Sequence, residues 1–297
     1  MVDQSNLTKG ISLIIVSYCG VKRLEKCLES VMSQTIATNL VEVIIVINGR
    51  DDGSIRLIQE LTHKLANFEI KMLYTPEKGV ANARNLGIAQ ARREFTVFLD
   101  DDDVISPNYL AGLFKYADLE SLTLCQLKNI TSPTALAEVS SCLHQTSNSV
   151  CLNWLFAVVT VMRVMTMNAC KIVPTKYLRE FKFDVNLKSS EDMVLFSALY
   201  ISRRLSLKVV PRHEQACYYR LARQDSLSRQ TISYDFNIRQ RLAVISGILR
   251  SIDDRSQLSH PVKFGFFLSR VLGEVMYSVR ILVNNINYWL RRCFIRS

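Results

Sequence analysis

Four consecutive aspartates at residues 100–103 form the densest group of carboxylates in the chain, directly after an apolar run at residues 95–99. Unit charges about 4 Å apart repel by roughly 4 kcal/mol at an effective dielectric of 20, so such a site needs a cation or wide exposure. Oxygen ligands on a short loop suit Mg²⁺ or Mn²⁺, which takes one or two carboxylates and leaves positions for substrate phosphates. A solvated acidic turn before a helix that starts near Ser106 and Pro107 explains the segment equally well when it is taken alone.

Two further segments carry residue types that this chemistry would use. Residues 78–87 combine glycines and alanines with Arg84, whose guanidinium offers a planar donor fork to phosphate or carboxylate. Glu191 and Asp192 form a second acidic pair where a helix is expected to begin. The preference of helix starts for acidic residues also accounts for such a pair, so neither segment is decisive by itself.

A third segment, residues 218–229, mixes basic, hydroxyl and aromatic side chains and includes Arg220 and Arg229. Such side chains can bind a diphosphate through charge-assisted hydrogen bonds. A solvated loop has much the same composition.

Apolar runs alternate with helical periodicity along the first half of the chain, and these elements must position the segments above. The pattern predicts strands at residues 11–16, 41–47, 69–74 and 95–99, and helices at residues 21–34, after 54, at 80–92 and at 106–120. Strands at this spacing with intervening helices predict βαβ units and a largely parallel sheet. Ligands of such sheets bind beyond the carboxyl ends of the strands, where residues 100–103 are expected to lie.

In this order, the segments resemble the family 2 glycosyltransferases of the GT-A fold. That pattern runs from a strand to an acidic D-G-S turn (residues 52–54), an A-R-N-x-G segment (83–87), a D-x-D at a strand end and an E-D pair. The resemblance covers about residues 11–230. It implies an α/β, Rossmann-like mixed sheet, mainly parallel and flanked by helices, and inverting transfer of a sugar from a nucleotide-diphosphate donor such as a UDP-sugar.

The resemblance also implies roles for individual residues. The family's D-x-D aspartates hold a divalent metal on the donor diphosphate, which makes Asp102, with Asp100, the expected ligands of Mg²⁺ or Mn²⁺. The family's E-D carboxylate is the general base, and this role carries over to Asp192, with Glu191 as its neighbour. The residues expected to bind the donor are Ser17, Asn48, Arg84, Asp100, Asp101, Arg220 and Arg229.

The chain departs from the family pattern in two places. Ile47 stands where an aspartate commonly contacts the nucleobase, so we expect Asn48 or Asp51 to substitute, and a protein that keeps the fold without binding a donor stays an alternative. The Q-x-x-R-W signature of processive polysaccharide synthases is absent. A transferase that adds a single sugar is therefore favoured.

Composition indicates one large core, or one core with a smaller lobe, because 48% of the 297 residues are hydrophobic. We expect a glycosyltransferase domain at residues 1–230, with a donor-binding half to residue 120 and an acceptor-side half after it. Eight cysteines without a C-x-x-C pair favour reduced thiols in a cytoplasmic protein, and the four dispersed histidines lack the spacing of metal ligands. The polar N-terminus lacks the basic and apolar blocks of a signal peptide, so export is not expected.

The basic excess is confined to the C-terminal third. Residues 203–297 carry 17 basic and 6 acidic side chains, whereas residues 1–202 carry 20 and 21. Residues 231–297 form the expected basic helical region, and from residue 264 apolar side chains recur at helical spacing. Such a helix suits an anionic membrane surface, where each basic residue contributes about 1 kcal/mol, and it equally suits packing on the catalytic lobe.

Membrane docking would make a lipid-linked saccharide the natural acceptor, in bacterial surface polysaccharide or lipopolysaccharide assembly at the inner face of the cytoplasmic membrane. Two other classes stay open. A nucleotidyltransferase shares the acidic ligands, but residues 17–20 contain a single glycine where its phosphate loop would lie. A nucleic-acid-binding protein would use the basic third, but the aromatics there have the spacing of a packed helix and not of a stacking platform.

Overall fold

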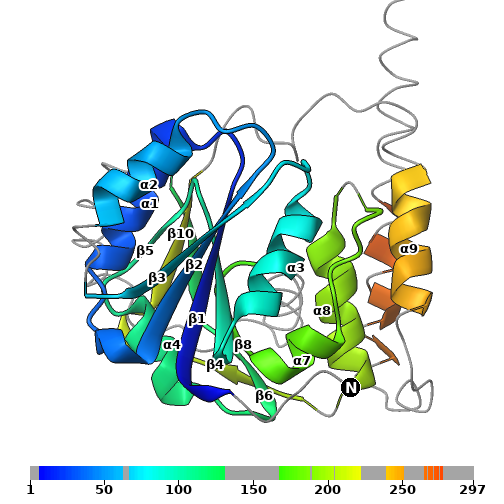
Figure 1. Ribbon diagram of the computed structural model, residues 1–297. Coiled ribbons are helices and arrows are strands. Elements are labelled where there is room, and N and C mark those ends of the chain that lie inside the picture. Colours follow the sequence, from blue (N-terminus) through cyan, green and yellow to red (C-terminus); the bar gives the residue numbers. More distant parts are fainter. Residues whose placement is uncertain are drawn as a thin grey trace, which may run out of the picture.

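Strands and helices alternate through the first hundred residues of the computed structural model (Figure 1). The structure describes residues 7–62, 67–130, 167–187, 189–203, 205–221 and 239–250, and much of 264–276. The strands are β1 (Thr8–Ser17), β2 (Val41–Asn48), β3 (Glu69–Thr75), β4 (Arg93–Asp100), β5 (Val104–Ile105), β6 (Ser121–Leu124), β7 (Gln126–Ile130), β8 (Lys171–Pro174), β9 (Ser206–Val209) and β10 (Cys217–Leu221). The helices are α1 (Val21–Met32), α2 (Ser54–Thr62), α3 (Val80–Gln90), α4 (Tyr109–Tyr116), α7 (Thr175–Glu180), α8 (Glu191–Ser202) and α9 (Gln240–Arg250), with short 3-10 turns at Thr38–Leu40 and Arg212–Glu214.

Seven strands form the main sheet in the order β3-β2-β1-β4-β8-β6-β9. The four strands β1 to β4 are mutually parallel, as the alternation of the sequence predicts. The strand β8 runs antiparallel to both β4 and β6, while β9 is parallel to β6. The sheet is therefore mixed and mainly parallel, and strands from the second half of the chain extend the sheet that the first half begins.

Helices cover both faces of this sheet, which explains why its central strands are almost continuously apolar. Successive side chains of a strand point to opposite faces. In β1, Ile11, Leu13 and Ile15 pack on the face of α1, α2 and α4, whereas Ile14 and Val16 pack on the face of α3, α7 and α8. Figure 1 shows α1 and α2 on one side of the sheet and α3, α7 and α8 on the other.

The strands β1, β2 and β4 end at one edge of the sheet, and this edge carries the candidate site. The register pairs Val16 with Asp100 and Ser17 with Ile47, so the turns after these strands are neighbours. The helix α3 approaches β1 closely, because a Cβ at Gly87 would lie 2.6 Å from Cγ2 of Ile14. The last glycine of the A-R-N-x-G segment thus permits the packing that brings Arg84 to the sheet.

A second sheet, in the order β5-β10-β7, lies beside the turn that follows β4. The strand β5 pairs antiparallel with β10, and β10 pairs parallel with β7. The sequence pattern did not predict this sheet, because β5 has two residues and β10 follows it after more than a hundred. It places residues 217–221 against the aspartates.

The C-terminal part of the described chain packs on α8. Val244 and Ile248 of α9 form a small buried cluster with Val194 and Ile201 of α8, and Phe267 packs against that cluster. The basic helical region predicted from residue 231 therefore contains at least one helix. Residues 277–297 lie outside the described part of the chain.

Five cysteines of the described residues are free thiols, namely the exposed Cys19 and the buried Cys27, Cys125, Cys170 and Cys217. Burial raises the pKa of Cys170 to about 12, as expected for an unreactive thiol. Across the described ranges, every helix is too short or too polar to cross a membrane.

Candidate active site

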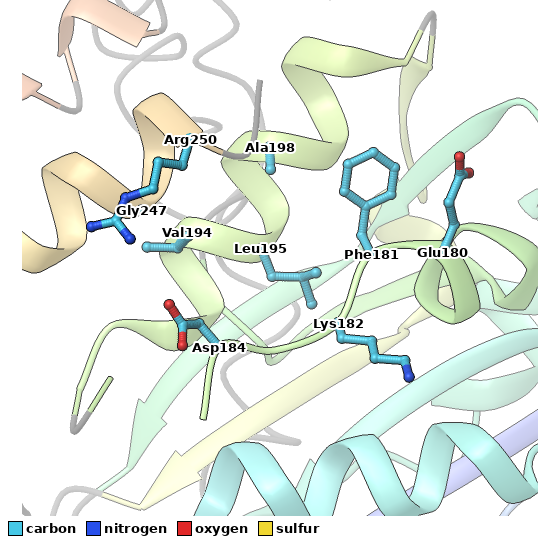
Figure 2. A pocket seen from close by; sticks show the side chains of 9 residues that line it. All are labelled: Glu180, Phe181, Lys182, Asp184, Val194, Leu195, Ala198, Gly247 and Arg250. Atoms are coloured by element: carbon cyan, nitrogen blue, oxygen red, sulfur yellow. The ribbon is translucent and has the colours of Figure 1, made fainter. Parts of the chain in front are cut away.

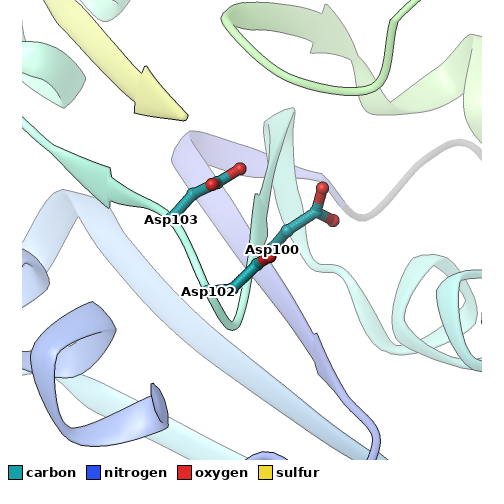
Figure 3. Close-up of side chains that lie close together, drawn as sticks. All are labelled: Asp100, Asp102 and Asp103. Carbon is teal, nitrogen blue, oxygen red and sulfur yellow. The ribbon is translucent and has the colours of Figure 1, made fainter. Parts of the chain in front are cut away.

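Three carboxylates converge in the turn between β4 and β5 (Figure 3). Asp100, Asp102 and Asp103 each offer one oxygen, and these oxygens lie within 4.8 Å of one another. Asp100 and Asp102 are half-buried and Asp103 is buried. This crowding at the carboxyl end of a strand matches the donor set that a hard divalent cation takes.

Asp103 is held from the second sheet. The hydroxyl of Tyr218 donates to its Oδ2 over 2.8 Å, and the backbone N–H of Leu221 donates to its Oδ1 over 2.9 Å. Burial, together with the charges of Asp100 and Asp102, raises the pKa of Asp103 to about 8. A proton therefore relieves the repulsion in this cluster at neutral pH, and a bound cation would do so in its place.

Asp101 has different partners from its neighbours. Its carboxylate accepts hydrogen bonds from the Ser17 hydroxyl at 2.7 Å and from Nη2 of Arg23 at 2.9 Å. A Cβ at Gly20 would lie 2.2 Å from the same carboxylate, so the β1–α1 loop closes tightly over it. Ser17 and Asp101, both expected to bind donor, are thus bonded to each other in the buried base of the site.

Arg84 joins the two acidic regions that the sequence separates by about ninety residues. Its Nη2 donates to Oδ1 of Asp100 over 3.1 Å and its Nη1 donates to Oε1 of Glu191 over 2.7 Å. The guanidinium is buried, and although burial opposes it, the charges of Asp100 and Glu191 raise the pKa of Arg84. Burial raises the pKa of Glu191 despite this contact. Arg84 therefore fixes the position of the E-D pair relative to the aspartate turn.

Asp192 lies in the first turn of α8 and is half-buried. Its Oδ1 accepts from the N–H of Met193 over 2.8 Å, and its Oδ2 accepts from the N–H of Asn168 over 3.2 Å. The helix begins after Ser190, which has a left-handed φ of 61° and whose hydroxyl accepts from Nη1 of Arg241 in α9. These two backbone donors hold the Asp192 carboxylate in place at the N-terminus of α8.

The end of β2 contains Ile47, where the family pattern has an aspartate, and Asn48, which was expected to substitute for it. Ile47 is buried in the core. The Asn48 amide donates to the Ser17 carbonyl over 3.0 Å and its Oδ1 accepts from the N–H of Gly79 over 3.2 Å. Asn48 therefore links the loops after β1 and β3. Asp51 accepts from two backbone N–H groups at the start of α2.

An exposed aromatic ring lies at this same edge. Tyr18 is 40% exposed, and the ammonium group of Lys78 lies 4.5 Å from the centroid of its ring. A Cβ at Gly49, whose φ is 79°, would lie 2.8 Å from the Tyr18 ring, so this glycine leaves room for the ring over the end of β2. Arg220 lies exposed on β10, two residues after Tyr218. Arg229 lies outside the described residues.

Some residues of the site have roles that the sequence did not predict. Arg23 and Tyr218 bind aspartates of the turn from distant segments, and Lys171 is a buried lysine next to the region of Asp192. A lysine inside the short apolar run of β8 was the available clue to the last of these, since lysine is rarely buried without a partner. Arg23 resembles an ordinary helix residue. Tyr218 lies in the segment 218–229, which was expected to bind a diphosphate and not an aspartate.

A cavity of about 320 Å³ lies elsewhere, between the loop after α7 and the helices α8 and α9 (Figure 2). It is lined by Glu180, Phe181, Lys182, Asp184, Val194, Leu195, Ala198, Gly247 and Arg250. Neither the aspartate turn nor the E-D pair contributes to its wall. The candidate chemistry is therefore located outside this cavity.

Comparison with known proteins agrees with the motif order. The sequence model of the protein family glycosyl transferase family 2 matches residues 12–157 of this chain. The poly(ribitol-phosphate) beta-N-acetylglucosaminyltransferase TarS of Staphylococcus aureus (strain MW2) is 23% identical over 288 residues, which cover 94% of this chain and 48% of TarS. The minor teichoic acid biosynthesis protein GgaB of Bacillus subtilis (strain 168) is 24% identical over 239 residues, 80% of this chain and 26% of GgaB. The chain thus spans about half or less of the length of these relatives.

Solved structures show the same fold. Staphylococcus aureus TarS 1–349 in complex with UDP-GlcNAc superposes with a TM-score of 0.64 at 19% identity, covering 88% of this chain and 72% of that one. Mannosyltransferase PcManGT from Pyrobaculum calidifontis, in complex with GDP-Man and Mn²⁺, gives a TM-score of 0.61 at 12% identity, covering 95% of this chain and 78% of that one. With its mainly parallel sheet, and with Arg84 joining its aspartate turn to its E-D pair, this chain has the GT-A fold, and its residues 12–157 belong to glycosyl transferase family 2.

Proposed function

We propose that the protein transfers a sugar, with inversion, from a nucleotide-diphosphate donor to a saccharide or lipid-linked acceptor of a bacterial surface polymer. The donor that the comparisons favour is a UDP-sugar, since the TarS structure holds UDP-GlcNAc. The names of TarS and GgaB favour a polymer of the teichoic acid type. The single observation that carries the proposal is the convergence of Asp100, Asp102 and Asp103 beside the Arg84-linked E-D pair.

The aspartate turn fits a divalent cation. Its three oxygens lie close together, and burial, together with the charges of Asp100 and Asp102, raises the pKa of Asp103 to about 8. We propose that Asp102 and Asp100 hold Mg²⁺ or Mn²⁺. When bound, such an ion would offset the negative charge that develops on the departing nucleoside diphosphate.

The E-D pair supplies the base in this proposal. Asp192 takes the proton from the attacking hydroxyl of the acceptor, while Glu191, paired with Arg84, sets the position of the helix start. Attack on the face of the sugar opposite the diphosphate inverts the anomeric carbon. A positioned general base typically contributes about 10²- to 10⁴-fold to the rate.

The remaining proposed contacts to the donor come from residues near the carboxyl ends of the same strands. The half-exposed ring of Tyr18, with Lys78 beside it, offers a stacking surface for the nucleobase that an aspartate at position 47 would otherwise help to bind. Arg220 on β10, and Arg229 beyond the described residues, are proposed to contact the diphosphate. Asn48, Ser17 and Asp101 shape the loops around the donor through their own hydrogen bonds.

Calorimetric binding of UDP tests the donor site. We expect UDP to bind with Mn²⁺, to bind much more weakly with EDTA, and to lose its metal-dependent binding in Asp102→Ala. Asp118→Ala is the matched control, because Asp118 pairs with Lys208 at the surface and takes no part in the site. Absence of binding by UDP, GDP and other nucleotides would overturn the donor-site proposal and favour a protein that keeps the fold without the activity.

We also propose that the C-terminal region docks on an anionic membrane from the cytoplasmic side. Phe264, Leu268, Leu272 and Val275 are exposed at helical spacing, whereas Phe267 packs toward α8 and α9. One side of this segment is thus available to lipid while the other is attached to the domain. Cosedimentation with vesicles rich in anionic lipid, and not with neutral vesicles, is the expected result; equal recovery with both would contradict it.

A further inference from the structure

Lys171 is a fully buried lysine beside the candidate base. It is the first residue of β8 and is 1% exposed. Its ammonium nitrogen lies 3.8 Å from the centroid of the Phe196 ring. Phe196 follows Asp192 by four residues on α8, so the two side chains are neighbours on the helix surface.

One peptide group joins Lys171 to Asp192. The Nζ of Lys171 donates to the carbonyl oxygen of Met167, and the N–H of Asn168 donates to Oδ2 of Asp192 over 3.2 Å. This carbonyl and this N–H belong to the same planar peptide unit, so fixing one orients the other. Positive charge at the carbonyl end also strengthens the N–H as a donor, because hydrogen bonds in series polarise one another.

We propose that Lys171 is a positioning residue for Asp192 and acts through the peptide between Met167 and Asn168. This inference rests on the proposed role of Asp192 as the general base. The other backbone donor to the carboxylate, Met193, belongs to α8 itself. Among the described contacts, the one through the peptide that Lys171 holds therefore links the Asp192 carboxylate to β8 of the central sheet.

The energetics favour a specific role for this lysine. Burying an amine is costly unless it gains compensating contacts, and here burial lowers the pKa of Lys171 to about 7. The charges of Cys170 and Asp192 oppose that shift. The other charged groups near the base are Glu191 and Arg84, and both are unchanged in the variants described below.

Nuclear magnetic resonance can observe the peptide directly. Met167 and Asn168 form the single Met-Asn sequence in the chain, so labelling with carbonyl-¹³C methionine and ¹⁵N asparagine yields one correlated amide signal. We expect the Asn168 amide proton of the full-length protein to lie downfield in acid and to move upfield with a midpoint near pH 7, as Lys171 loses its proton.

Variants separate Lys171 from other groups that titrate. Lys171→Met should abolish the step, and Lys171→Arg, which stays charged, should keep the amide proton near its acid position across the range. Lys208→Met removes a half-exposed lysine of β9 that pairs with Asp118, and it should leave the step intact. A step that persists in Lys171→Met, or its absence from the wild type, would overturn the proposal; if Lys171→Met fails to fold, the wild-type and Lys171→Arg titrations decide.

Kinetics and binding complete the test. Lys171→Met should bind UDP with Mn²⁺ within about threefold of the wild type. Its transfer of the sugar from UDP-GlcNAc to an acceptor hydroxyl or to water, followed as UDP release, should be slower by about tenfold or more, because a misplaced base slows proton removal from the attacking hydroxyl and leaves donor binding unchanged. Lys171→Arg should recover part of that rate. Equal losses of UDP binding and rate would contradict a positioning role. The amide titration needs no catalytic activity, so failure of the proposed function and failure of this inference give different results.

Discussion

The two acidic regions of the site differ in how their carboxylates are stabilised. At the start of α8, Glu191 pairs with the guanidinium of Arg84, and Asp192 reaches the ammonium of Lys171 through one peptide group. In the turn after β4, Asp103 is bound by a tyrosine hydroxyl and a backbone N–H, which are neutral donors. In the turn, Arg84 and Arg23 pair with Asp100 and Asp101 and leave Asp103 with neutral donors.

A single turn contains the same contrast. Asp101 bonds to Arg23 and Ser17 and closes the loop after β1, while the residues on either side of it face the carboxylate cluster. Adjacent aspartates therefore serve different purposes. Asp101 is thus tied to the loop after β1, whereas we propose that its neighbours Asp100 and Asp102 hold the cation.

Loss of the proposed base should have the strongest effect, and it should lower the reaction rate without weakening donor binding. Asp192→Asn should lower the rate of UDP release from UDP-GlcNAc, or from the nucleotide sugar that a donor screen selects, by about 10²- to 10⁴-fold, because the base is lost. Its affinity for UDP with Mn²⁺ should stay within about threefold of the wild type. Asp184→Asn is the control, since Asp184 caps an exposed turn with Asn186. A large loss of UDP affinity in Asp192→Asn would instead place this residue in the donor site.

The second prediction concerns how Asp103 makes the stability of the protein depend on pH. In the folded, metal-free protein Asp103 keeps its proton up to about pH 8, whereas an unfolded aspartate loses it near pH 4. The folded state binds more protons between these values, so the contribution of Asp103 to the free energy of unfolding is full below about pH 4 and is lost as the pH rises through 8. A cation bound at the proposed site would replace that proton.

The measurement is the rise in Tm that Mn²⁺ produces at different pH. The rise should be larger at about pH 9 than at about pH 6 in the wild type, because at the higher pH fewer molecules carry the Asp103 proton that the cation must displace. Asp103→Asn imitates the protonated form. In this variant, the stability of the metal-free protein should lose the pH dependence that Asp103 contributes. An equal Mn²⁺ effect at both pH values in the wild type would remove the turn as the cation site.

The smallest expected effect tests the structural role of Asp101. Ser17→Ala removes one donor to its carboxylate but leaves Arg23, so the free energy of unfolding should fall by about 1 kcal/mol. UDP affinity should change less than about threefold. Ser33→Ala, which loses a hydroxyl bond at an exposed helix end, should cost less. A tenfold loss of UDP affinity in Ser17→Ala would mean that the hydroxyl contacts the donor directly.

Much of the fold followed from local pattern. The predicted strand at residues 11–16 lies within β1, and the predicted strand at 95–99 lies within β4, because continuous apolar runs mark strands buried on both faces. The second sheet was not predicted, since β5 is too short to show periodicity. The boundaries of the two expected halves stay a prediction, although one sheet contains strands from both.

The residue types of the site, the alternation that yields a mainly parallel sheet, and the position of the aspartates at a strand end can all be read from the amino-acid sequence. Which aspartate faces which partner depends instead on tertiary packing. Asp103 meets Tyr218 across 115 positions of the chain, and Arg84 meets Glu191 across 107. Pairings over such separations depend on how whole elements pack, and no local preference of the chain encodes the direction in which each side chain of a tight turn then points.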